Sequence, residues 1–146
     1  MNGIAKLQQA RTRSRFVAPD SVSMEALVFL DKAHQLLAQA ATAEAYEEKI
    51  EFAVQASLRA AGAVLAGDMG KKRRKPAGSA WVRLAAKGGD WAEWSQRATT
   101  VMRIREDVRL GIGSDPDQFT AERVLSFARK FIAYVEAQLR VLPAAA

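Results

Sequence analysis

The chain has 146 residues, no cysteine, one histidine and a formal net charge of +6 at pH 7. This length fits one domain, and 49% hydrophobic against 26% charged residues is the balance of a globular protein. The absence of cysteine excludes disulfides, thiol catalysis and iron–sulfur clusters, and leaves a zinc site without its usual ligands. No apolar run reaches the ~18 residues of a membrane span, and the basic N-terminus lacks the apolar core of a signal peptide. We therefore expect a cytoplasmic protein that uses no metal or cofactor and does not enter a membrane.

Five segments have the apolar spacing of three and four residues that is typical of amphipathic helices. They run from Met24 to about Ala41, from Thr42 to Gly67, from Ser79 to Gly88, from Asp90 to Gly111, and from Thr120 to Pro143. No segment alternates apolar and polar residues between turn signals, so we expect no sheet. The prediction is an all-α protein, an up-and-down antiparallel bundle of four long helices and one short helix with short connections.

Helix boundaries are predicted from capping residues, whose side chains accept hydrogen bonds from the first backbone N–H groups. The candidate N-caps are Ser23, Thr42, Ser79, Asp90 (with Glu93 in a capping-box pattern) and Thr120. The domain boundaries that follow are a basic tail at 1–19, a bundle at 20–142 with a basic loop at 67–78, and a short tail at 143–146.

The positive charge is concentrated in two segments outside the predicted helices. Residues 1–19 and 67–78 each carry a charge of +4, and the rest of the chain is slightly negative. The five consecutive cations Lys71–Lys75 repel one another. An anionic partner relieves this repulsion, and a nucleic acid also releases counterions when it binds.

Trp81 and Arg83 follow the basic run by a few residues, and an aromatic ring beside cations suits single-stranded nucleic acid, whose bases stack. The alternatives are a core role for Trp81 with a merely solvated loop, or a loop that binds a protein. Arg59 has no acidic residue three or four positions away, so it is either an exposed edge residue or an anion site. The candidate nucleic-acid or phosphate-binding residues are Lys71, Lys72, Arg73, Arg74, Lys75, Arg59, Arg83 and Trp81.

The remaining polar residues indicate a surface rather than a catalytic centre. His34, the only histidine, lies on an apolar helical stripe between Leu30 and Leu37, as a core or interface histidine does. The arginines at 97, 103, 105 and 109 are a second possible basic stripe. Arg103 can meet Glu106 and Asp107 one turn away, and Arg109 can meet Glu106, which favours an exposed, salt-bridged face for much of the stripe.

Three stretches occur in a characteristic order. They are the alanine-rich run Ala53–Ala66 before the basic loop, then Ala80-Trp81-Val82-Arg83-Leu84, and then Trp91-Ala92-Glu93-Trp94. Together they resemble the SAV-type actinobacterial branch of the HEPN (higher eukaryote and prokaryote nucleotide-binding) superfamily, over residues 24 to about 141.

This resemblance implies a helical bundle that is often dimeric, in a superfamily associated with nucleotide or RNA binding. Many HEPN proteins are metal-independent RNases with an R-x4-6-H motif, whose arginine and histidine activate the scissile phosphodiester. The positions for that arginine before His34 are occupied by Leu27, Val28 and Phe29, so the RNase motif is absent.

The first functional hypothesis is a non-catalytic HEPN-like domain that binds RNA or nucleotide phosphate through the basic loop. A second is a helical interaction module or homodimer that partners another protein, as an antitoxin does. A third is a diverged RNase that brings His34 and Arg59 together.

Overall fold

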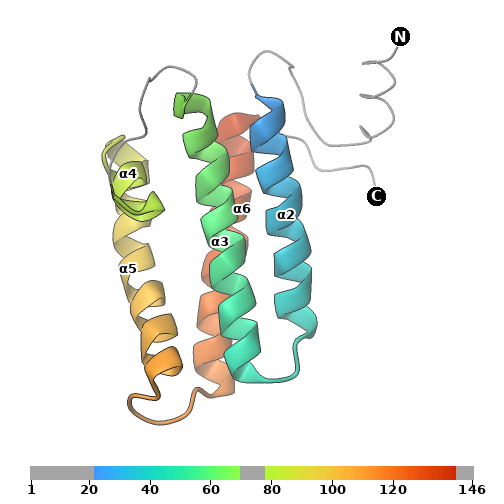
Figure 1. Ribbon diagram of the computed structural model, residues 1–146, viewed down its shortest axis with the longest axis vertical. Coiled ribbons are helices and arrows are strands. Elements are labelled where there is room, and N and C mark those ends of the chain that lie inside the picture. Colours follow the sequence, from blue (N-terminus) through green and yellow to red (C-terminus); the bar gives the residue numbers. More distant parts are fainter. Residues whose placement is uncertain (1–21, 70–77, 141–146) are drawn as a thin grey trace.

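The computed structural model describes residues 22–69 and 78–140. Within these ranges the chain forms five helices and no strand (Figure 1). They are α2 (Met24–Thr42), α3 (Tyr46–Met69), α4 (Ala80–Ala85), α5 (Gly89–Leu110) and α6 (Gln118–Leu139). The predicted class, an all-α protein with four long helices and one short one, is confirmed.

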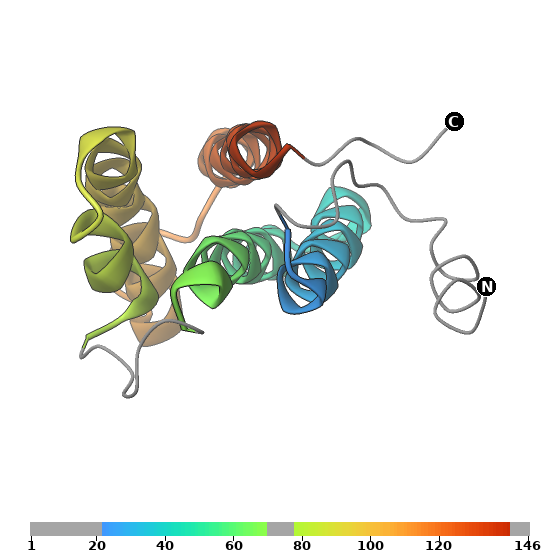
Figure 2. The same cartoon turned by 90° about the horizontal axis from the view of Figure 1, so that it is seen from above.

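The long helices run alternately down and up the bundle, as predicted (Figure 1). Seen from above, α3 lies between α2 and α5, and α6 packs behind α3 (Figure 2). The central helix α3 contacts every other helix of the described chain. α3 ends at Met69, at the upper end of the bundle in Figure 1, and the basic run Lys71–Lys75 follows it in the sequence outside the described residues.

Small side chains allow α2 and α3 to pack closely. Five alanines of α3 are at most 1% exposed: Ala53, Ala56, Ala60, Ala61 and Ala63. At Gly62 an added Cβ would lie 3.0 Å from the Cε1 atom of Phe29, tighter than ordinary van der Waals contact. Glycine at this position therefore lets the Phe29 ring lie directly on α3.

The apolar stripe of α6 supplies much of the core. Val124, Phe131 and Val135 are fully buried, as the helical spacing predicted. Leu30 of α2 and Leu84 of α4 are also buried, so every one of these side chains contributes its transfer from water, roughly 1.5–3 kcal/mol for a large apolar residue.

The helix starts agree with prediction at two of the five positions. Ser23 accepts a hydrogen bond from the Ala26 N–H at 3.0 Å, and Ser79 accepts one from the Val82 N–H at 3.2 Å. Thr42 does not cap α3. It is the last residue of α2, and its hydroxyl donates to the Ala38 carbonyl one turn back.

The predicted caps of α5 and α6 are each displaced. Asp117, in extended conformation, caps α6 by accepting from the Thr120 N–H at 2.8 Å, which lowers the pKa of Asp117 below its usual range. Gly88 precedes α5 with no side-chain cap, and the carboxylate of Asp90 instead accepts from the Tyr134 hydroxyl at 2.9 Å. Tertiary contacts and turn residues thus decide these ends, not the capping pattern alone.

Candidate nucleic-acid interface

The structure places the predicted binding residues in different surroundings. Lys71–Lys75 lie outside the described residues. Trp81 is 8% exposed, with its ring 5.2 Å from that of Phe131 and 6.2 Å from that of Phe127. The predicted stacking role of Trp81 is therefore corrected, because a ring packed in the core offers no face to a base.

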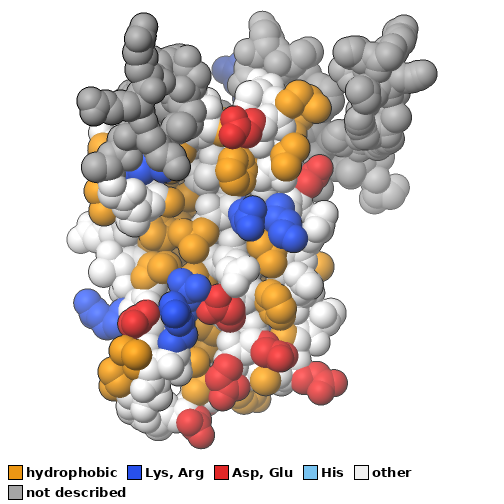
Figure 3. Space-filling model, viewed as in Figure 1, with side chains coloured by type: hydrophobic (Ala, Val, Ile, Leu, Met, Phe, Trp, Pro, Cys, Tyr) orange, Lys and Arg blue, Asp and Glu red, His pale blue; other side chains and the backbone are white. Residues whose placement is uncertain are grey.

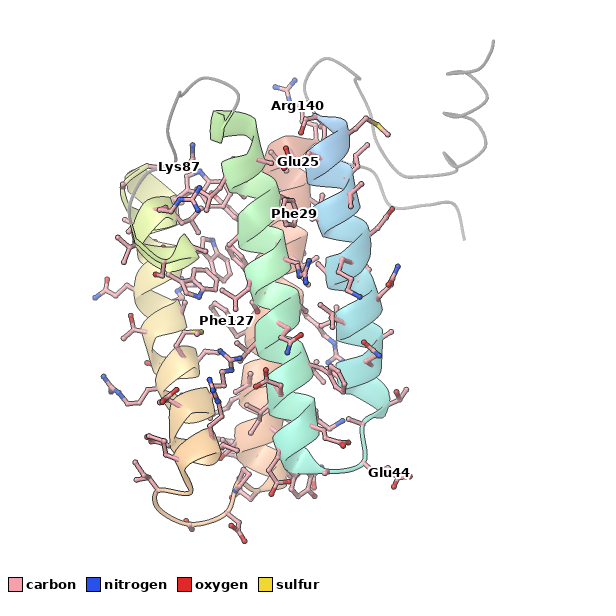
Figure 4. The ribbon with its side chains drawn as sticks, in the orientation of Figure 1. Glu25, Phe29, Glu44, Lys87, Phe127 and Arg140 are labelled. Atoms are coloured by element: carbon pink, nitrogen blue, oxygen red, sulfur yellow. The ribbon has the colours of Figure 1, made fainter. Side chains whose placement is uncertain are left out.

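Arg59 and Arg83 remain at the surface in part. Arg59 is exposed on α3, and within the described ranges no hydrogen bond or ion pair engages it. Arg83 is half-buried on α4 and lines a hollow of about 170 Å³ with Glu25 and Phe29 (Figure 4). The negative charge of Glu25 would repel an anion that entered this hollow. Figure 3 shows the cations of this face in separate groups, with acids at its upper end as well as over its lower half.

Two of the α5 arginines, Arg105 and Arg109, have acidic partners, but only the pairing of Arg109 with Glu106 follows the sequence prediction. Arg105 donates two hydrogen bonds to Glu51 of α3, and these hold the pKa of the Glu51 carboxyl below its ordinary value. Arg109 lies 3.8 Å from Glu106, one turn away. Arg97 and Arg103 form no ion pair within the part of the chain that the structure describes.

Arg97 instead lies in a groove between α5 and α6. Two hollows of about 420 and 260 Å³ share Arg97, Arg123 and Phe127 and together form what we call the α5–α6 groove. Its lining residues are Trp94, Arg97, Thr100, Val101 and Ile104 from α5, and Phe119, Glu122, Arg123, Val124, Ser126, Phe127 and Lys130 from α6.

Large rings separate α5 from α6 and so create this groove. The Trp94 ring packs 5.8 Å from Phe127, 5.3 Å from Phe131 and 5.5 Å from Tyr134. Phe127 projects from α6 into the space beside α5 (Figure 4). The alanines of α3 let α2 pack closely against it. Between α5 and α6, by contrast, the indole and phenyl rings hold the two helices apart, and the α5–α6 groove lies beside these rings.

The groove has an excess of positive charge. Arg97, Arg123 and Lys130 line it, against the single carboxylate of Glu122, and none of the three cations forms an ion pair with a described residue. The guanidinium of Arg97 lies 4.7 Å from the centre of the Trp94 ring, a cation–π contact that fixes its position. Phe119 is 70% exposed at one end of the groove.

Sequence reasoning missed the α5–α6 groove because its cations come from two helices. The available signal was on α6, where residues 119, 122, 123, 126, 127 and 130 follow helical spacing and mix rings with charges. Such a face is too polar for a core and too aromatic for a purely solvated surface.

His34 is engaged in the fold, as expected of an interface histidine. Its Nε2 atom lies 2.7 Å from the Glu136 carboxylate, joining α2 to α6. Among the described residues no hydrogen bond or ion pair joins His34 to Arg59. No described cluster of acidic or histidine side chains could hold a metal ion, and no described helix is long and apolar enough to cross a membrane.

The described chain is therefore a small antiparallel helical bundle with a cationic, aromatic groove between α5 and α6. The family model of HEPN_SAV_6107-like HEPN matches residues 38–136, which include α3, α4, α5 and most of α6. This is more than half of the chain, and the protein belongs to that family. No curated protein and no solved structure matches it.

Proposed function

We propose that this protein is a non-catalytic HEPN domain that binds RNA or another chain of nucleotide phosphates. The observation that carries the proposal is the α5–α6 groove, where Arg97, Arg123 and Lys130 face only Glu122. These three exposed cations have no acidic partner among the described residues, so they are available to phosphate groups. When RNA binds, these cations replace counterions condensed on its phosphates, and the release of the counterions favours binding.

The basic loop belongs to the same proposal. Lys71–Lys75 would add charge to the binding surface, with Arg59 and Arg83 on the helices beside the loop. Trp81 has no part in it, because its ring is in the core. Absence of the R-x4-6-H motif and the engagement of His34 by Glu136 support binding without cleavage.

The test is a titration of a fluorescent single-stranded oligouridylate of about a dozen nucleotides with the full chain, followed by anisotropy. The decisive variant is Arg97→Gln/Arg123→Gln. The matched control is Arg103→Gln/Arg129→Gln, because it removes the same charge from the same two helices at exposed positions outside the groove.

We expect the groove variant to bind about tenfold more weakly at low salt, and its dependence of log K on log salt to be flatter by about 1.4. The control should retain the slope of the parent to within a few tenths. Equal losses in the two variants would show that only net charge matters and would overturn the assignment to the groove.

The alternative functions predict other results in the same assay. If the parent leaves the RNA unbound even at about 50 mM salt, the proposal is wrong. A parent that ignores RNA but is dimeric by light scattering would favour the interaction module. Shortened RNA after incubation would favour the diverged RNase, provided that His34→Ala abolishes the cleavage.

A further inference from the structure

One aromatic side chain of the α5–α6 groove, Phe119, packs little against the rest of the bundle. Phe119, in the first turn of α6, is 70% exposed, the most exposed large hydrophobic residue of the described chain. Single exposed apolar residues are common on protein surfaces. Phe119 differs because it lies in a groove with three cations that have no acidic partner.

The other rings of the groove, Trp94 and Phe127, are partly buried and packed against neighbouring side chains. One face of Trp94 carries the guanidinium of Arg97, and its ring packs against Phe131 and Tyr134. Phe127 is stacked on Phe131 with an interplanar angle of 9°. Among the rings that line the groove, Phe119 is therefore the most exposed.

The cations follow Phe119 along the same side of α6. Arg123 is one turn from Phe119, and Lys130 is two turns further, so the ring and the last cation are about 16 Å apart along the helix axis. Arg97 faces them from α5. A strand lying along the groove would meet a ring at one end and charges over the rest of its path.

We infer that the α5–α6 groove holds a short single-stranded segment of about three nucleotides, with one base stacked on Phe119 and a phosphate at each of Arg97, Arg123 and Lys130. This inference rests on the proposed function and adds the strandedness and the base contact. A duplex keeps its base faces inside its own stack, so it cannot offer one to Phe119. Three phosphate contacts should contribute about −2 to the salt slope.

Stacking and ion pairing respond differently to salt, which separates the role of Phe119 from that of the cations. Removal of the ring should lower affinity at every salt concentration and leave the slope unchanged, because no counterion is released by stacking. Since Phe119 is 70% exposed, its replacement should also leave the fold intact, which thermal unfolding by circular dichroism will check.

The experiment compares the parent with Phe119→Ala, Phe119→Leu and Phe119→Tyr on three probes: single-stranded oligoadenylate, the same strand in a duplex, and base-free polyphosphate. On the single strand we expect Phe119→Ala and Phe119→Leu to lose about 5- to 100-fold in affinity, with the same dependence of log K on log salt as the parent. Phe119→Tyr should bind like the parent. On polyphosphate all four proteins should bind equally, and the parent should prefer the single strand to the duplex.

The inference is overturned if Phe119→Ala binds the single strand as the parent does, or if it loses as much affinity for polyphosphate. It is also overturned if Phe119→Leu binds the single strand as tightly as Phe119→Tyr does. An aliphatic side chain can pack against a base but offers no ring face for stacking. In each of these cases the parent still binds RNA and the proposed function stands. A parent that binds none of the three probes refutes the proposed function itself.

Discussion

Arg105 of α5 donates two hydrogen bonds to the carboxylate of Glu51 on α3, from its Nε atom at 2.9 Å and from an Nη atom at 2.8 Å. This two-point contact fastens the second half of α5 to the central helix. The first half of α5 is held to α6 by its indole rings. The α5–α6 groove thus lies along a helix that is anchored to different neighbours at its two ends.

Replacing Arg105 by Gln should lower the free energy of unfolding by about 1 kcal/mol at pH 7, since the pair is bidentate but partly exposed. The folded-state pKa of Glu51 is depressed from its ordinary value of 4.5. A depressed carboxyl pKa stabilises the fold at higher pH, and this contribution is lost as the pH falls through the folded-state pKa. Urea unfolding of parent and variant at neutral and at acidic pH measures both effects. A difference between the two proteins that is as large in acid as at pH 7 would contradict this account.

Replacing Trp81 by Leu should reduce the free energy of unfolding by about 2–4 kcal/mol, because a buried indole is exchanged for a smaller side chain next to Phe127 and Phe131. At a temperature where the variant is folded, its salt slope for RNA binding should match that of the parent. Thermal unfolding and anisotropy give the two numbers. A variant that is as stable as the parent but has lost RNA affinity would show that Trp81 contributes to binding and not only to the core.

Purified protein should leave a mixed RNA pool intact, and His34→Ala should bind RNA as the parent does. The reason is that His34 is held by Glu136 and has no arginine at the motif positions. Loss of this hydrogen bond should cost about 1 kcal/mol of stability. Gel analysis of the RNA, with His34→Ala as the comparison, decides the point, because cleavage by the parent alone would assign a catalytic role to His34.

Neutralising Lys71–Lys75 with glutamine should weaken RNA binding and flatten its salt dependence by about 0.7 for each phosphate contact that is lost. If the loop and the α5–α6 groove engage the same strand, the slope changes of the loop variant and of Arg97→Gln/Arg123→Gln should add in the combined variant. The measurement is the same anisotropy titration over about 50–200 mM salt. An unchanged slope in the loop variant would make the loop a solvated connection only.

The helices themselves were predictable because their apolar spacing is a local property of the chain. Phe131 and Val135 are buried as that spacing required. Helix ends were less predictable. Thr42 closes α2 because α3 starts only at Tyr46, and the α2 carbonyls of Ala40 and Ala41 are satisfied by the Lys49 ammonium, a tertiary contact.

The candidate site shows the same division. The sequence predicted pairs of Arg103 and Arg109 with acids one turn away, and Arg109 does lie near Glu106. The two-point contact of Arg105 with Glu51 joins two helices and was not predicted. Arg97 and Arg123 are 26 positions apart, and only the antiparallel pairing of α5 and α6 makes them face one groove. The groove results from the size of the side chains between α5 and α6 and not from their charges. The effect of the Trp91 and Trp94 rings on the separation of the two helices cannot be read from the sequence pattern.

The packing of α5 against α6 through large rings also gives the two sides of α6 different roles. The side of α6 that bears Phe131 and Val135 holds the bundle together, while Phe119 and Arg123 are exposed and contribute little to folding. Surface exchanges of this kind usually change stability by no more than about 0.5 kcal/mol. Substitutions at the groove positions should therefore change the charge and shape of the groove while the bundle stays folded, so the groove can be redesigned residue by residue.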